Sequence, residues 1–153
     1  MEKVSKKEMF FYGAPSALTM FGLTAFITTD IILVKHFFTP EQAGLYAGLS
    51  LIGRIIFFFS APIGSVMFPL VTQKYAKKEA YHHEFFLSLI LVLIPSVLLT
   101  IFYFLFPAFA INFFLKNKEY LRVANLLGIF GIYITMYSLL TIFINFYLSI
   151  KKT

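Results

Sequence analysis

The sequence contains no cysteine and no tryptophan, and only 13% of its residues are charged. The lack of cysteine excludes both a disulfide framework and a thiolate metal site. Soluble domains carry about 25% charged residues, so this chain of 153 residues has too few charges to cover a surface that faces water. Hydrophobic residues make up 59% of it, with 21 phenylalanines among them. This composition is typical of an integral membrane protein.

Four long apolar runs divide the chain, and each is long enough to cross a bilayer as a helix of about 20 residues. We expect helices at about residues 9–36, 40–77, 83–115 with a break at Pro107, and 119–150. No run alternates apolar with polar residues, which argues against membrane β-strands. The sequence therefore predicts an all-α membrane protein, one transmembrane domain over residues 1–153 with four helices in antiparallel up-down order.

The turn between the first two helices is marked by Thr39-Pro40-Glu41-Gln42. This segment supplies an N-cap hydroxyl, a proline at the first helical position, and acidic and amide side chains in the first turn, which together indicate a helix start. We therefore expect a tight turn at about residues 36–39 and an antiparallel hairpin of helices. The small residues that follow predict close helix packing; they are Ala43, Gly44, Ala47 and Gly48.

Prolines interrupt the longest predicted helices. A helix from Pro40 to Lys77 would be roughly 55 Å long, which exceeds one crossing, so we expect it to kink at Pro62 and Pro69. Pro107 is expected to end the third crossing, so that residues 108–115 lie along the membrane interface.

Basic residues gather in short clusters between the apolar runs, which is how membrane proteins encode their orientation. One side of the predicted helices carries Lys3, Lys6, Lys7, Lys74, Lys77, Lys78, Lys151 and Lys152. The other side carries Lys35, Lys116, Lys118 and Arg122. Eight against four places both termini in the cytoplasm. The same distribution argues against a nucleic-acid partner.

Three ionisable residues fall within or close to the predicted spans: Asp30, Lys35 and Arg54. Such groups are costly in a membrane and usually face a bundle interior or a cavity, so they are our candidates for a substrate cavity. Lys35 lies near enough to its helix end to extend outward. Asp30 and Arg54 differ in depth by roughly 8 Å in a regular hairpin, so a direct ion pair requires a kink or a long reach. A structural pair and a polar transport cavity both remain open.

The residue pattern argues against an enzyme. The glutamates lie at helix ends or in loops, no span contains a pair of carboxylates, and no glycine-rich phosphate loop is present. His82 and His83 fall in a predicted loop without further metal ligands nearby. We expect no catalytic residue, no metal and no cofactor.

A family resemblance rests mainly on the first two helices. The residues Thr29–Phe38 and Pro40–Ala47, followed by Gly53-Arg54 and Phe68-Pro69-Leu70, resemble the aspartate, the turn and the terminal Phe-Pro of the polysaccharide flippases. These proteins belong to the multidrug/oligosaccharidyl-lipid/polysaccharide exporter superfamily. The segment Asn145–Ser149 is similar to the polar end of a helix in the same family.

The resemblance implies a fold and an activity. Members have twelve to fourteen helices in two lobes and flip undecaprenyl-linked oligosaccharides across the prokaryotic cytoplasmic (inner) membrane by alternating access, for polysaccharide biosynthesis. The chain resembles the first four helices of the second lobe, so we expect a partial lobe: a gene fragment, a truncated reading frame, or a piece that assembles with further helices or a partner chain. Transport by alternating access requires two lobes.

The resemblance also implies roles for individual residues. Asp30 and Arg54 would face the cavity between the lobes, with Arg54 contacting a pyrophosphate. Gly44 and Tyr46 would shape the hairpin turn, and Pro62 and Pro69 would supply bends for opening and closing. The partners implied are a lipid-linked oligosaccharide and membrane lipids.

Three alternatives stay open. The chain could belong to a related drug exporter or lipid II exporter of the same superfamily. It could be a small membrane scaffold or assembly subunit without transport of its own. A membrane-embedded transferase is the weakest alternative, because His82 and His83 have only Glu79 and Glu84 as acidic neighbours.

Overall fold

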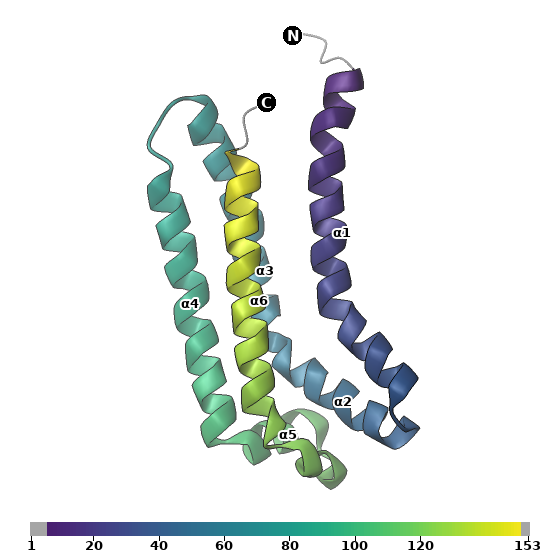
Figure 1. The fold of residues 1–153 in the computed structure, drawn as a ribbon. Coiled ribbons are helices and arrows are strands. Elements are labelled where there is room, and N and C mark those ends of the chain that lie inside the picture. The colour runs from purple at the N-terminus through teal and green to yellow at the C-terminus, as the bar shows by residue number, and fades with distance from the viewer. Residues whose placement is uncertain (1–5, 151–153) are drawn as a thin grey trace.

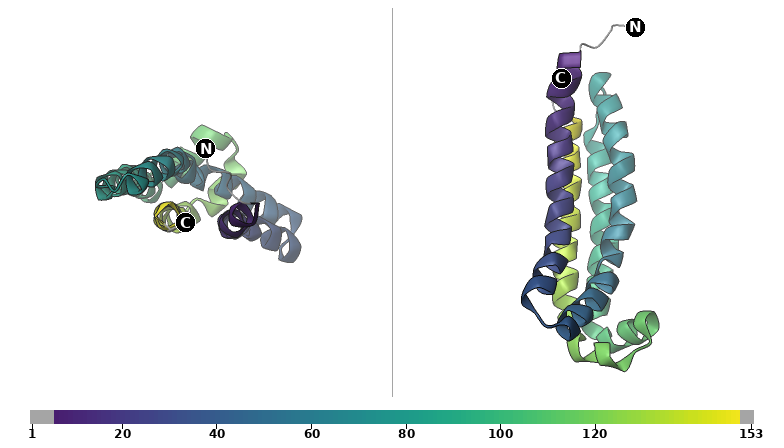
Figure 2. Two further views of the ribbon diagram at one scale, coloured as in Figure 1. Left: turned by 90° about the horizontal axis from the view of Figure 1, so that it is seen from above. Right: turned by 90° about the vertical axis from the view of Figure 1, so that its right-hand side faces the viewer.

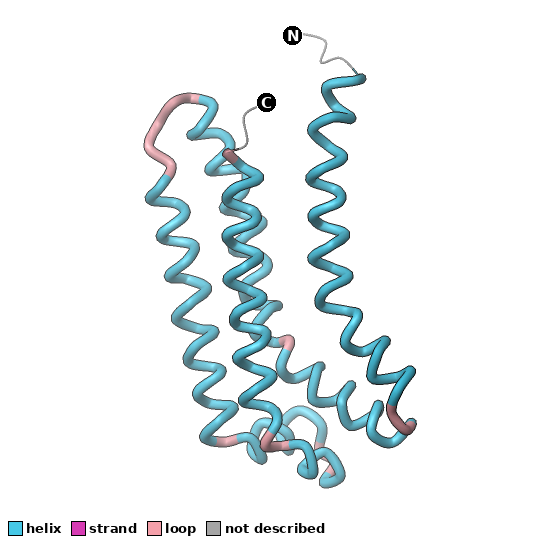
Figure 3. Tube along the Cα trace, viewed as in Figure 1, coloured by secondary structure: helices cyan, strands magenta, loops and turns pink. Residues whose placement is uncertain are grey.

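The structure, a computed structural model, describes residues 6–150, with side chains described from residue 14 onward. It consists of α1 (Lys6–Phe37), α2 (Pro40–Gly53), α3 (Ile55–Ala76), α4 (His82–Leu105), α5 (Pro107–Leu115), the 3-10 helix η1 (Lys118–Val123) and α6 (Leu126–Ser149). Residues 6–150 contain no strand (Figure 3). Four helices, α1, α3, α4 and α6, are long and apolar enough to cross a membrane. The prediction of an all-α membrane protein with four antiparallel crossing helices is confirmed.

Three of the crossing helices, α3, α4 and α6, pack side by side, whereas α1 stands apart from them over much of its length (Figure 1, Figure 2). In its most apolar stretch of 18 residues, α6 is 50% buried, against 6% for α1. The second half of α1 bends toward α2 and joins the bundle there (Figure 1). The core is therefore built on α6, with α1 held mainly through its hairpin with α2.

Small and hydroxyl side chains bring α4 and α6 together. A Cβ added to Gly131 would lie 3.2 Å from the Tyr103 ring and 3.3 Å from the Thr100 hydroxyl. The hydroxyls of Thr100 and Thr135 are 2.9 Å apart in a buried hydrogen bond between the two helices. Tyr103 also donates to the Ile52 carbonyl at 2.9 Å and so ties α4 to the end of α2. Contacts of this kind are typical of helix pairs in membranes. Lipid tails are as apolar as the helices, so close packing and hydrogen bonds, not the hydrophobic effect, hold the helices together.

The helix ends that carry local signals lie where the sequence predicts them. Thr39 caps α2 in a capping box with Gln42, and Pro40 is the first residue of the helix. The third crossing ends at Leu105, and a separate short helix, α5, begins at Pro107 and lies across the base of the bundle (Figure 1).

The stretch from Pro40 onward is divided at a different place from the one predicted. The chain turns at Arg54, whose ψ of −7° departs from the value near −42° of a regular helix. Helix α3 then continues through both Pro62 and Pro69. The stretch therefore breaks at Arg54, where α2 leaves the α3 axis (Figure 1), and the expected kinks at Pro62 and Pro69 within α3 stay predictions. A bending role for the two prolines during transport stays a prediction.

The last crossing also differs at its start. Residues 118–123 form the 3-10 helix η1, and a turn at residues 124–125 separates it from α6. The N-cap of η1 is Asn117, whose side chain accepts a hydrogen bond from the Glu119 N–H. The crossing helix is therefore shorter than the predicted 119–150.

The described basic residues are divided between the two ends of the bundle as predicted. The start of α1, the turn between α3 and α4 and the end of α6 lie at one end, and α5 and η1 lie at the other (Figure 1). Lys74 at the first end pairs with Glu84 across the turn. Lys3, Lys151 and Lys152 lie outside the described residues, as do the side chains of Lys6 and Lys7. Which end faces the cytoplasm stays a prediction.

Candidate functional site

An ion pair joins α1 to the break between α2 and α3. Arg54 Nη2 lies 2.9 Å from Asp30 Oδ1 and 3.2 Å from Asp30 Oδ2. Each side chain is 17% exposed. The break at Arg54 removes the depth offset of a regular hairpin, because α2 turns away from α3 and brings the guanidinium level with Asp30. The direct ion pair between Asp30 and Arg54, which was expected to require a kink or a long reach, therefore forms because the helix breaks at Arg54.

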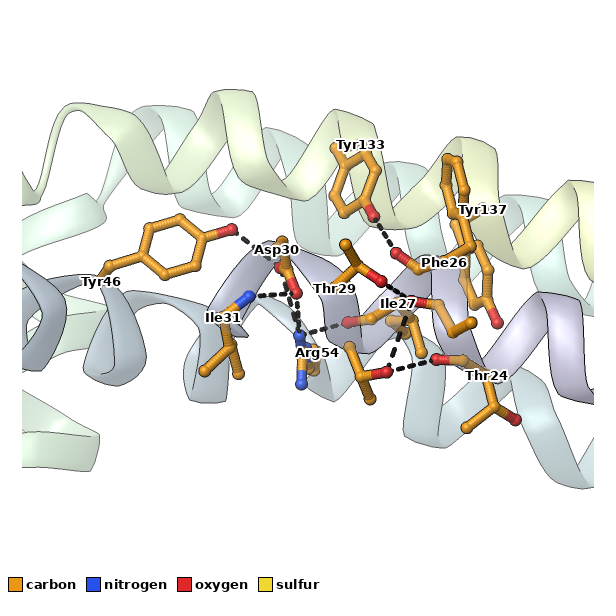
Figure 4. Close-up of polar contacts among 12 residues, drawn as sticks. Thr24, Phe26, Ile27, Thr29, Asp30, Ile31, Tyr46, Arg54, Tyr133 and Tyr137 are labelled. Carbon is orange, nitrogen blue, oxygen red and sulfur yellow. Dashed lines mark hydrogen bonds and ion pairs between the residues drawn. The ribbon is translucent and has the colours of Figure 1, made fainter. Parts of the chain in front are cut away.

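Two further donors complete the hydrogen bonding of the Asp30 carboxylate. The Tyr46 hydroxyl donates to Oδ2 at 2.8 Å, and the Ile31 N–H donates to Oδ1 at 2.8 Å. Figure 4 shows Tyr46 and Arg54 converging on Asp30. A buried charge is tolerated only when it is paired and hydrogen-bonded, and both conditions are met here.

Arg54 also binds the backbone of α1. Its Nη2 donates to the Ile27 carbonyl as well as to Asp30. In a regular α-helix that carbonyl receives the Ile31 N–H, which here contacts the Asp30 carboxylate. The side chains of the ion pair thus contact both the carbonyl of Ile27 and the N–H of Ile31, the two groups that bond to each other in a regular helix. Arg54 Nε is buried without a hydrogen-bond partner among the described residues.

Five successive carbonyls of α1 accept side-chain hydrogen bonds next to the ion pair. The Leu23 carbonyl accepts from Tyr137 at 2.8 Å, and the Phe26 carbonyl accepts from Tyr133 at 3.4 Å. The Thr24 and Ala25 carbonyls accept from Thr28 at 2.7 Å and from Thr29 at 2.6 Å, respectively. The Ile27 carbonyl accepts from Arg54. Threonine bonds of this type to the preceding turn bend helices. The two tyrosines lie one turn apart on α6, so they fix α1 against the bundle core at this level.

A pocket opens beside the ion pair, with a volume of about 380 Å³. Asp30 and Tyr46 form its polar wall, and its apolar walls are Leu49, Leu126, Ile129, Phe130 and Tyr133. The Tyr46 ring meets the Phe130 ring edge-on at 5.9 Å between centroids. The pocket therefore combines one charged, hydrogen-bonded edge with aromatic walls, an arrangement suited to binding a molecule.

The remaining candidate residues lie elsewhere. Lys35 is exposed and forms no ion pair or hydrogen bond with any residue between 14 and 150. Gly44 is exposed in α2, with nothing within 4 Å of a Cβ added there. Close packing applies instead to Gly48, whose added Cβ would lie 2.2 Å from the Tyr120 ring. In the described part of the chain, no three metal-ligating side chains gather at one place.

The tyrosines are the site residues that the sequence did not reveal. Tyr46 was expected to shape the turn, but its hydroxyl is a direct partner of Asp30. Tyr133 and Tyr137 come from a helix more than a hundred residues further along the chain than their α1 partners. Their spacing of four residues on one helix face was the available signal.

The family model MatE matches residues 15–153, which include every element of the site. No curated protein and no solved structure matches the sequence.

Proposed function

Because the chain belongs to the MatE family, a family of membrane transporters in the multidrug/oligosaccharidyl-lipid/polysaccharide exporter superfamily, we propose that it forms part of a transporter for lipid-linked oligosaccharides. The observation that carries this proposal is the pocket beside the Asp30–Arg54 pair. A guanidinium in a largely buried setting binds phosphate oxygens well. Arg54 is not among the residues that line the pocket, so the pyrophosphate of a lipid-linked sugar would have to displace the Asp30 carboxylate to reach it.

Binding would proceed by exchange at Arg54. A pyrophosphate oxygen would compete with Asp30 for the Arg54 guanidinium, whose Nε has no partner among the described residues. Asp30 would keep its hydrogen bonds from Tyr46 and the Ile31 N–H during the exchange. The aromatic wall formed by Phe130 and Tyr133 would contact the lipid or the first sugar.

Alternating access requires a second set of helices across the pocket. The side of the pocket formed by α6 exposes apolar residues, with Ile129 60% exposed and Leu126 50% exposed. We propose that further transmembrane helices, in the same or a partner chain, face this side. The membrane would be the prokaryotic cytoplasmic membrane, with both termini cytoplasmic, as the distribution of lysines predicts.

Export of an organic cation is the second candidate function. Tyr46, Phe130 and Tyr133 surround one carboxylate, Asp30. Aromatic faces and a carboxylate together favour a cationic amphiphile. One experiment distinguishes the two ligands.

The test uses cysteine labelling, because the chain has no cysteine of its own. Ile129→Cys places a thiol in the pocket wall, and Glu79→Cys, at an exposed position in the turn between α3 and α4, serves as the water-exposed control. The rate of reaction with a water-soluble thiol reagent is measured in proteoliposomes, with undecaprenyl-pyrophosphate-linked oligosaccharide or with tetraphenylphosphonium.

We expect the lipid-linked oligosaccharide to slow labelling at residue 129 and to leave the labelling rate at residue 79 unchanged. Protection by tetraphenylphosphonium alone would favour cation export. An Ile129→Cys thiol that never reacts would contradict a water-accessible pocket.

A further inference from the structure

The short helix α5 has one buried face and one aromatic face. Ala110 and Ile111 are buried against the bundle, whereas Phe109 is 61% and Phe113 65% exposed. The rings of Phe109 and Phe113 stack with centroids 6.2 Å apart. An apolar helix of this kind, lying across the end of the bundle (Figure 1), is positioned at the boundary between acyl chains and headgroups.

A groove of about 210 Å³ runs under α5. Its walls are apolar or aromatic and come from three helices, including Ile55 of α3, Leu99 and Phe102 of α4, and Phe113 of α5. The one hydroxyl in the lining belongs to Tyr103 and donates to the Ile52 carbonyl. The groove therefore offers contact to a hydrocarbon chain and no free polar group.

Two lysines follow the aromatic face directly. Lys116 ends α5 in a left-handed conformation with φ 50°, and Lys118 begins η1. Both are exposed, and neither forms an ion pair with a described residue. The next cation, Arg122, is already paired with Glu41 at 2.9 Å. Glu119 is the one acidic residue among these lysines, so the segment keeps an excess of positive charge.

From this arrangement we propose that α5 and the start of η1 bind an anionic phospholipid. Its acyl chain occupies the groove under α5, and its phosphate lies against Lys116 and Lys118. Lys116 follows Phe113 by three positions, so the lysines lie directly beside the aromatic face against which the acyl chain would rest. Each lysine near an anionic headgroup favours binding about fivefold.

The absence of tryptophan makes a direct test possible. Phe113→Trp places a single fluorophore at the groove, and Leu98→Trp, at a side chain 60% exposed on α4, places one on the lipid-facing surface away from the lysines. The full chain is reconstituted in nanodiscs that contain phosphatidylglycerol and phosphatidylcholine in equal amounts. In one sample the phosphatidylglycerol is brominated, and in the other the phosphatidylcholine is brominated. Quenching reports which lipid occupies the site.

For Phe113→Trp we expect phosphatidylglycerol to be preferred over phosphatidylcholine by about 25-fold, fivefold for each lysine. The preference should fall close to one when Lys116 and Lys118 are changed to glutamine. It should survive the matched double change of Lys77 and Lys78 at the opposite end of the bundle. Leu98→Trp should show no headgroup preference.

Two results would overturn the proposal. Equal quenching of Phe113→Trp by both lipids would mean that the lysines select no headgroup. Quenching by neither lipid, with normal quenching of Leu98→Trp, would mean that another protein segment covers the groove.

Discussion

Removal of the Arg54 guanidinium should expose how strongly the Asp30 carboxylate depends on it. Arg54→Met leaves Asp30 with two donors, the Tyr46 hydroxyl and the Ile31 N–H, and with no counter-charge among the described residues. It also deprives the Ile27 carbonyl of its side-chain donor. Breaking one partner of a buried ion pair costs about 3–5 kcal/mol. Because each side chain is still 17% exposed, we expect about 2–4 kcal/mol.

The double-mutant cycle isolates the pair itself. Asp30→Asn should cost a similar amount, because Arg54 then loses its counter-charge and keeps only neutral acceptors, the Ile27 carbonyl and the amide oxygen at position 30. Asp30→Asn combined with Arg54→Met removes both charges, so the double variant should be more stable than the sum of the single losses predicts, by about 2 kcal/mol. Arg54→Lys should fall between wild type and Arg54→Met, since a single ammonium cannot reproduce the planar fork of the guanidinium.

The free energy of unfolding is measured in mixed micelles of increasing dodecyl sulfate fraction, followed by far-ultraviolet circular dichroism. Thr72→Val is a suitable control, because its exposed hydroxyl bonds only within its own helix. Additive losses in the double variant would refute the interaction between Asp30 and Arg54. So would an Arg54→Met variant as stable as the control.

Three other predictions concern packing and orientation. Gly53→Ala should destabilise the fold by about 1–3 kcal/mol, because the added Cβ would lie 2.1 Å from the Phe130 ring. Gly44→Ala is the control: nothing lies within 4 Å of its added Cβ, so the unfolding midpoint should stay unchanged or rise. Tyr103→Phe should cost about 1 kcal/mol through loss of the buried bond to Ile52, seen as a lower melting temperature in detergent. A reporter enzyme that works only in the cytoplasm should be active when fused to the C-terminus, and one that works only in the periplasm should be inactive there. The opposite result would reverse the predicted orientation.

Features set by neighbouring residues could be predicted from the sequence. The N-cap at Thr39, the helix start at Pro40 and the break at Pro107 all depend on residues within one turn of each other. The four crossing helices follow from the length and composition of each run. Asp30 and Arg54 stood out because charge is rare in a span. Local sequence therefore identified the right pair of residues without their geometry.

The geometry depends on distant parts of the chain. The break at Arg54 could not be located from the sequence, because it follows from contacts with Ile27 in α1 and from the packing of Gly53 on Phe130. The prolines of α3 were a stronger local signal, but the chain divides into two helices at Arg54 and not at either proline. The role of Tyr46 was likewise hidden, since it requires the hairpin to bring Asp30 within reach.

The row of α1 carbonyls from Leu23 to Ile27 has a mechanical consequence. Each of these carbonyls already accepts a side-chain donor, so each would keep a partner if its bond to the following turn lengthened. In a membrane an unpartnered carbonyl is costly, and that cost normally keeps a helix straight. Here the cost is largely removed over one and a half turns. We therefore expect α1 to bend at this segment, so that residues 14–22, which are exposed or half-buried, move relative to the bundle while the backbone stays hydrogen-bonded.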